Sequence, residues 1–351
     1  MHRTKLFRAA GTAALLVALA ACSVGGGTEP SSTSTGAGSD DSFIIGVSNT
    51  VAGNGWREQL ICAVKAEALV SGKVSKVIAI SKNGGPTEQI QDLQSLISQG
   101  VNAIIVNPSD LEKLNPIIDE AHQQGIVVVA VDSPVSSENA YIAVTDQQAW
   151  GRLNAEWLFE KIGGSGKVLY MRGIEGVPAD TDRDAGFREA LAAYPDITVK
   201  EVWTGWDYTK AGEVAVSELS AAGYDGIWTS GTDYTVVNAL ATAGVDPVPV
   251  TGQDTNAFVK QLVDGADGAV ITNPAIIGGI GADIAIRALS GESPERETLL
   301  TPTVLDPATD LAVLQEEYAP DRDDLWSTTV GVEGLTHFTR EQMIACVGPG
   351  E

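Results

Sequence analysis

Two short polar segments of this sequence are suited to hydrogen-bonding a ligand. Asn107-Pro108-Ser109-Asp110 follows the apolar run 103–106, and Asp132-Ser133 follows the apolar run 126–131. Unbroken apolar runs of this length are typical of parallel strands that helices cover on both faces. Ligands of open α/β sheets bind just beyond the carboxyl ends of such strands. We therefore expect a site for a polar ligand at this edge of the sheet.

The residues around these runs predict the elements that position them. Gly100 and Gly125 each stand where a helix ends and a strand begins, and glycine accepts the left-handed capping conformation there. Pairs of an apolar run and an amphipathic helix repeat along the chain in two consecutive sets. Right-handed crossovers turn each set into a parallel sheet. The predicted fold class is α/β, with two doubly wound parallel-sheet lobes.

We place three hinge crossings between the lobes, near Thr145, Pro274 and Leu305. The N-terminal lobe then comprises residues 43–145 and 274–305. The C-terminal lobe comprises 146–273 and 306–315. The tail 316–351 is acidic and irregular, with a short helix near Thr339, and the sequence does not place it against either lobe.

The N-terminus has the pattern of an export signal. Basic residues within the first eight positions precede the apolar segment 9–21, which is too short to span a bilayer comfortably. Leu-Ala-Ala directly before Cys22 resembles a bacterial lipobox, in which the cysteine is acylated and becomes the new N-terminus. The alternative is an ordinary signal peptide with a chance cysteine. We expect a signal peptide at 1–21, a lipidated Cys22 and a flexible Gly/Ser/Thr tether to residue 42. The protein would then be extracytoplasmic and anchored to the bacterial cell membrane.

The charge of the chain argues against nucleic acid as a partner. It has 22 Lys and Arg against 46 Asp and Glu. Neutralising phosphates requires clusters of basic side chains, which this composition does not supply. An acidic surface keeps a protein soluble, and we expect a monomer.

Cys62 and Cys346 remain once Cys22 is assigned to lipid. An exported protein can keep disulfides, and an even number of cysteines suggests a bridge between these two. The alternative is two independent buried thiols, because spacing alone does not show that the residues are close.

At this point the sequence resembles a known family, the type I periplasmic-binding class, close to the ribose and related sugar binders of bacterial ABC importers. The resemblance covers roughly residues 43–305. It rests on the order and spacing of the segments I-G-V-S-N, Q-I-Q-D-L-Q-S-L-I-S-Q-G-V-N-A-I-I-V-N-P, G-I-V-V-V-A-V-D-S, D-R-D-A-G-F-R-E-A-L, V-T-G-Q-D and G-A-V-I-T-N-P-A-I-I-G. The same fold occurs in sugar-responsive repressors, but this chain has a lipobox where their DNA-binding headpiece would stand.

The resemblance implies two lobes that close on a ligand in the cleft between them. It also implies a function: a solute-binding lipoprotein that captures a sugar or polyol and delivers it to the permease subunits of an ABC importer. The alternative is a sensory protein that presents a small signal, such as a furanosyl autoinducer, to a membrane receptor.

The resemblance assigns four ligand-binding positions to the first lobe. Asn49 would supply an amide, Trp56 a stacking plate for a sugar ring, and Arg57 a donor to hydroxyl groups. Asp132 matches an acid of the family, but Ser133 stands where the family usually has arginine, which argues against ribose itself. Trp56 and Arg57 could instead pack at a helix start, and Asp132 could cap a turn.

The resemblance assigns six more positions to the second lobe and the second crossing. They are Thr181, Arg183, Trp206, Asp233, Asp254 and Asn273. Thr181 takes the place of a ligand-facing arginine, and Asn273 the place of a glutamine. Arg183 could be structural, and Trp206 could be a core residue.

Other chemistries fit the sequence poorly, and we expect neither an enzyme nor a cofactor. Gly163-Gly164-Ser165-Gly166-Lys167 lacks the first glycine and the final Ser or Thr of a phosphate loop. The three histidines are far apart in the chain and show no metal-ligand spacing. No Gly-x-Ser-x-Gly motif occurs, and acid pairs suited to glycoside hydrolysis are expected by chance among so many carboxylates.

Overall fold

A computed structural model describes residues 42–351 of the chain. The expected signal peptide, Cys22 and nearly all of the expected tether lie outside the described residues. Within the described part, no helix combines the length and apolar character that a membrane span requires.

The first lobe is built on a six-stranded sheet in the order β11-β5-β4-β3-β1-β2, with every neighbouring pair parallel. Its strands are β1 (Phe43–Asn49), β2 (Val74–Ser81), β3 (Ala103–Val106), β4 (Val127–Val131), β5 (Ala140–Thr145) and β11 (Glu297–Leu300). Its helices are α1 (Gly55–Ser71), α2 (Pro86–Ser98), α3 (Asn115–Gln123) and α9 (Ile277–Leu289).

The second lobe repeats this plan in the order β12-β10-β9-β8-β6-β7, and β12 pairs antiparallel to β10. Its strands are β6 (Ser165–Arg172), β7 (Asp196–Trp203), β8 (Gly226–Thr229), β9 (Val250–Gly252), β10 (Gly268–Ile271) and β12 (Val304–Leu305). Its helices are α4 (Gln147–Lys161), α5 (Pro178–Leu191), α6 (Tyr208–Ala221), α7 (Asp233–Ala243), α8 (Asn256–Val263) and α10 (Pro307–Glu317). The predicted fold class is confirmed.

The apolar runs of the sequence are strands buried on both faces. Ile105 belongs to the core that α1 and α9 share with the sheet, whereas the adjacent Ile104 belongs to the core under α2 and α3. In the second lobe, Leu169 and Tyr170 divide in the same way between the α6–α8 side and the α4–α5 side. Because successive strand residues point to opposite faces, a sheet covered on both sides needs every residue of the run to be apolar.

The third crossing lies earlier than the sequence predicted. Val304 and Leu305 pair with β10 of the second sheet, so the chain leaves the first lobe after Leu300 and not near Leu305. The prediction erred because a two-residue strand has no pattern of its own.

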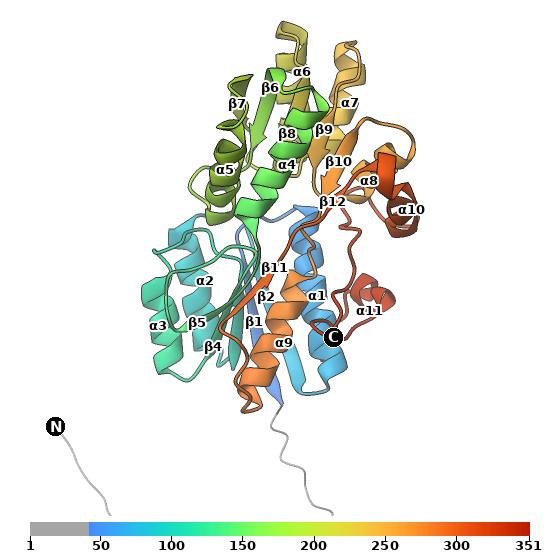
Figure 1. Ribbon diagram of the computed structural model, residues 1–351. Helices are drawn as coiled ribbons and strands as arrows, with labels where there is room; N and C mark the ends of the chain where they lie inside the picture. Colours follow the sequence, from blue (N-terminus) through green and yellow to red (C-terminus); the bar gives the residue numbers. More distant parts are fainter. Residues whose placement is uncertain (1–41) are drawn as a thin grey trace, which may run out of the picture. The chain divides into compact units, whose positions relative to one another are not determined.

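The C-terminal tail returns to the first lobe, where its short helix α11 (Arg340–Ala345) lies beside α1 (Figure 1). Phe338 and Met343 are buried in the core of α1 and α9, and the Sγ atoms of Cys62 and Cys346 are bonded. The backbone N–H of His337 donates to Glu67 of α1 at 2.9 Å.

Before it reaches α11, the tail contacts both lobes at Ser327. Ser327 and the side-chain amide of Gln59 in α1 exchange two hydrogen bonds, of 2.6 and 3.0 Å. The Ser327 hydroxyl donates to Asp254 of the second lobe at 2.7 Å. The tail is therefore a fourth connection between the lobes, in addition to the three predicted crossings.

Candidate functional site

A cavity lies between the two lobes, where the carboxyl ends of both sheets meet. About 30 Å³ of it is available to the centres of water molecules, so it is narrow. Residues of both lobes and of the second crossing line it: Asn54, Trp56, Arg57, Asp132, Ala179, Arg183, Trp206, Tyr208, Ser230, Gly231, Gln253 and Asn273. In each sheet these residues follow strand ends, the usual place for ligands of open α/β sheets.

The structure brings six of the ten predicted ligand-binding residues together around this cavity. They are Trp56, Arg57, Asp132, Arg183, Trp206 and Asn273. The other four predicted residues do not line it. Of the polar segments after β3 and β4, Asp132 alone lines the cavity. The Ser109 hydroxyl donates to Gln89, and Asp110 pairs with Lys113.

Asn49 stands behind the cavity and holds Arg57. Its Oδ1 atom accepts a hydrogen bond of 3.2 Å from Nη1 of Arg57, and its Nδ2 atom donates to Ser81 and to the backbone of Val51. Three of the four hydrogen bonds that this amide can form go to protein atoms, so it acts as a support. Thr181 is exposed on α5, and its hydroxyl donates to the carbonyl of Val177. It does not take the ligand-facing place that the resemblance implied.

Asp233 and Asp254 are fully buried and committed to protein partners. Asp233 accepts from the Thr255 hydroxyl at 2.6 Å and from the backbone N–H of Gln253 at 2.9 Å. Asp254 accepts from Ser327 of the tail and from the backbone N–H of Asn273 at 3.0 Å. Each carboxylate thereby fixes the loop that carries a cavity residue, Gln253 or Asn273.

Several cavity residues were missed in the sequence. Asn54 caps α1, with Oδ1 accepting from the N–H of Arg57, and its Nδ2 donates across the lobes to the carbonyl of Trp206 at 3.3 Å. An asparagine three residues before Arg57 is a recognisable helix-start signal. Gln253 and Ser230 follow β9 and β8, so the rule about strand ends would have found them.

Gln147 connects the two sides of the cavity although it does not line it. It is the first residue of α4, just after the first crossing. Its Nε2 atom donates to Asp132 at 3.4 Å and to Oδ1 of Asn273 at 3.1 Å. Its Oε1 atom accepts from Nε of Arg183 at 2.8 Å. One buried amide therefore orients an acid of the first lobe and a cation of the second.

Two cavity residues hold left-handed backbone conformations that non-glycine residues rarely adopt. Asp132 has φ of 67° and Trp206 has φ of 54°. Such conformations cost free energy and persist where the surroundings hold them, often at functional sites. Trp206 also requires Gly173, because a Cβ atom at that position would lie 2.1 Å from its indole ring. The surrounding structure therefore holds both residues in a strained backbone conformation that directs their side chains toward the cavity.

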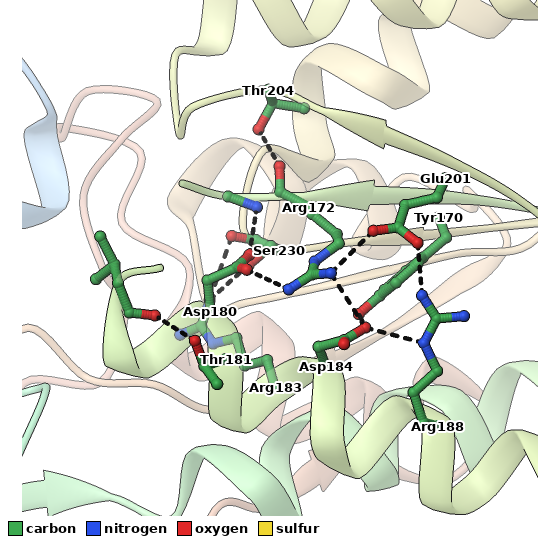
Figure 2. A network of polar contacts seen from close by, with 12 residues as sticks. Tyr170, Arg172, Asp180, Thr181, Arg183, Asp184, Arg188, Glu201, Thr204 and Ser230 are labelled. Carbon is green, nitrogen blue, oxygen red and sulfur yellow. Dashed lines mark hydrogen bonds and ion pairs between the residues drawn. The ribbon is translucent and has the colours of Figure 1, made fainter. Parts of the chain in front are cut away.

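A polar network positions α5, which carries Arg183 and Ala179 (Figure 2). Asp180 accepts from Arg172 at 2.5 Å and from the backbone N–H of Gly173 at 2.8 Å. Glu201 accepts from Arg172 and Arg188, at 2.8 and 2.5 Å. Since these contacts join α5 to β6 and β7, the start of α5 is fixed relative to the strand ends.

The two arginines of the cavity are nearly fully buried, with 5% and 3% of Arg57 and Arg183 exposed. Burial lowers the pKa of Arg57, while the charge of Asp132 acts in the opposite direction. Burial lowers the pKa of Arg183 to about 10. Arginine keeps its proton in proteins at neutral pH, so both guanidinium groups are charged.

One group of described residues has donor atoms spaced closely enough for a metal ion. Glu67, Asp283 and His337 offer atoms within 4.8 Å of one another. Nδ1 of His337 lies 2.8 Å from Oε1 of Glu67, which is a hydrogen bond that joins tail and α1 without an ion. None of the three lines the cavity. The histidine spacing in the sequence had shown no such group, because its members come from three distant segments.

Comparison with known proteins matches residues 45–293 to the model of a periplasmic binding protein domain. A xylitol-binding protein of Mycolicibacterium smegmatis is 26% identical over 272 residues, which cover 75% of this chain and 76% of that protein. The ribose import binding protein of Bacillus subtilis is 25% identical over 279 residues, which cover 77% and 88%.

Solved structures show the same fold. The binding protein of an arabinose ABC transporter from Shewanella sp. ANA-3, bound to α- and β-L-arabinofuranose, superposes with a TM-score of 0.71. It is 25% identical, and the match covers 78% of this chain and 95% of that one.

Proposed function

Since this chain belongs to the periplasmic binding protein domain family, we propose that it captures a sugar or polyol between its lobes and delivers it to an ABC importer. One observation carries this proposal. Polar and aromatic side chains from both lobes and from a crossing meet around one cavity at the carboxyl ends of the two sheets. The matched relatives are named as binding proteins for ribose and xylitol, which are polyhydroxylated small molecules.

The side chains of the cavity suit such a ligand. The guanidinium groups of Arg57 and Arg183 donate charge-assisted hydrogen bonds, and Asp132 accepts them from hydroxyl groups. The indole of Trp206 offers an apolar face to the carbon skeleton. Sugars and polyols present this combination of hydroxyl groups and C–H faces.

The cavity is narrow and enclosed by side chains of both lobes in this arrangement. Entry of a ligand therefore needs the lobes to separate or the arginine side chains to move. A ligand that contacts both lobes then stabilises the closed arrangement, since it shifts the equilibrium only through contacts that differ between the two states.

The setting of this function is also part of the proposal. Export, acylation at Cys22 and a flexible tether would hold the protein at the outer face of the cell membrane, close to the permease. The protein would act there as a monomer. The bridge between Cys62 and Cys346 suits an oxidising compartment.

A thermal-shift screen tests the proposal. A ligand that binds only the native state raises the melting temperature, by an amount that grows with its concentration. We expect at least one sugar, polyol or sugar acid of four to six carbons to do so. A complete panel without any shift would refute the proposed function.

A further inference from the structure

The cavity contains two cations that no acid neutralises directly. Arg57 comes from the first lobe and Arg183 from the second, and both are buried. Within residues 42–351, the ion pairs closer than 4.0 Å involve neither guanidinium group. Buried charges in proteins are normally paired, because an uncompensated charge away from water is costly. Two such cations at one cavity therefore call for an explanation.

Their present partners are neutral and leave donors free. Nη1 of Arg57 donates to the amide oxygen of Asn49. Arg183 donates from Nε to Gln147 and from Nη1 to the backbone and hydroxyl oxygens of Ser230. A guanidinium group has five N–H donors, and the Nη2 atoms of both arginines make no hydrogen bond within the described chain. These free donors belong to side chains that line the cavity.

Trp206 connects the surroundings of the two cations. The guanidinium carbon of Arg57 is 5.8 Å from the centre of this ring. Nε1 of Trp206 donates to the same Ser230 hydroxyl group that accepts from Arg183, at 3.1 Å in each case. Burial is the main cause that lowers the pKa of Arg183; the charge of Arg57 acts in the same direction, and the charges of Asp132 and Asp180 act against it. The two guanidinium groups are therefore linked through Trp206 and Ser230 and line the same cavity.

The nearby acids do not balance these charges. Asp132 is the one carboxylate that lines the cavity, and it accepts from Asn107 and Gln147 at 3.3 and 3.4 Å. Asp254 is engaged by Ser327 and the backbone of Asn273, and Asp180 by Arg172 (Figure 2). The cavity thus has two cations and one anion on its walls.

We propose that the ligand is a polyhydroxy acid, such as an aldonate, whose carboxylate binds between Arg57 and Arg183 while its hydroxyl groups bind Asp132 and the amides. This rests on the proposed function, because it assigns a ligand class to the same cavity. Arginine and carboxylate form short, charge-assisted and often bidentate hydrogen bonds. The carboxylate supplies the missing negative charge, and a neutral sugar does not.

Calorimetric titration with matched pairs tests this proposal. Ribonate and ribitol, or gluconate and glucitol, have the same hydroxylated chain and differ in the carboxylate at one end. Over aldonates of four to six carbons and their polyols and sugars, we expect the best acid to bind at least tenfold more tightly than its neutral partner. A neutral member that binds as tightly as its acid, or more tightly, would overturn the inference and leave the proposed function standing. If no acid, sugar or polyol binds, the proposed function fails as well.

Substitutions of the two arginines test whether they recognise the negative charge of the ligand carboxylate. Arg57→Gln and Arg183→Gln should each weaken acid binding at least tenfold and change the affinity for the neutral partner much less. Arg152→Gln is a matched control, because Arg152 pairs with Glu156 on the surface of α4. Equal losses for acid and neutral partner would mean that the arginines only bind hydroxyl groups or support the fold. The melting temperature of the ligand-free variants separates these roles, because a large drop relative to Arg152→Gln shows that the arginine supports the fold.

Discussion

Nε of Arg183 in α5 donates a hydrogen bond of 2.8 Å to Oε1 of Gln147, the first residue of α4 after the first crossing. Through its Nε2 atom, Gln147 also reaches Asp132 of the first lobe. The side chain just after the first crossing therefore contacts binding groups of both lobes. This arrangement couples the orientation of the binding groups to the hinge.

The first prediction concerns this coupling. Gln147→Ala should weaken ligand binding roughly tenfold or more, because Arg183 and Asp132 each lose the partner that orients them. Titration calorimetry with the best ligand measures the loss. Gln148→Ala is the control, since Gln148 is exposed and bonds Glu189 on the surface. An unchanged affinity for Gln147→Ala would show that the cavity does not depend on this amide.

The second prediction separates the two tryptophans. Trp56 is 5% exposed, belongs to the core of the first lobe and donates to the carbonyl of Asn273 at 2.7 Å. Trp56→Ala should therefore lower the free energy of unfolding by about 3–5 kcal/mol and also weaken binding. Trp206 is half-buried over the cavity, so Trp206→Ala should weaken binding with a much smaller effect on stability.

Chemical denaturation and calorimetry measure the two effects, with Trp157→Ala as control. Trp157 is half-buried on α4 and does not line the cavity. The opposite pattern, in which Trp206→Ala unfolds the protein and binding survives, would place Trp206 in the core.

Much of this architecture could be predicted from the sequence, because the patterns that reveal it involve residues that are neighbours in the chain. The runs at β3 and β4 are apolar at every position because each strand is covered on both faces. Such strands also predict where a site lies, and Asp132 was found at that place. A property that depends on neighbouring residues can be recognised before the fold is known.

What could not be predicted depends on contacts between distant segments. Gln147 reaches Asn273, 126 positions away, and Asn54 reaches Trp206, 152 positions away. Asp254 appeared free to bind ligand because its partner, Ser327, belongs to a tail that the family resemblance did not cover. No pattern of neighbouring residues shows that a side chain already forms hydrogen bonds with a distant segment.

The third prediction concerns the tail. The bond between Cys62 and Cys346 spans a sequence separation of 284. Replacing both cysteines by serine should lower the free energy of unfolding by up to about 4–5 kcal/mol in the chain-entropy account. Denaturation of the double variant measures this. Thiol titration of the denatured, unreduced protein carrying Cys22→Ser gives the direct check, and two free thiols per chain would refute the bridge.

The fourth prediction is a pH dependence of stability. Burial raises the pKa of Asp233 from 3.8 to about 6, against the hydrogen bonds that favour its charged form. Between these values the unfolded chain has released the proton while the native protein keeps it. The contribution of Asp233 to stability is therefore complete below about pH 4 and is lost as the pH rises through about 6, by roughly 3 kcal/mol.

Urea denaturation of Asp233→Asn and of the parent protein at pH 4 to 7 measures this contribution. The free energy of unfolding of the parent should fall relative to that of the variant across this range. The exposed Asp246→Asn serves as control. A constant difference between parent and variant would show that Asp233 is ionised throughout.

The most direct test of the central claim is native mass spectrometry of the protein purified from its own host with its ligand still bound. We predict one small polyhydroxylated molecule per chain, and its loss from Trp206→Ala. A bound molecule without hydroxyl groups, or a molecule that Trp206→Ala retains in full, would contradict the assignment of the cavity between the lobes as a site for a sugar-like ligand.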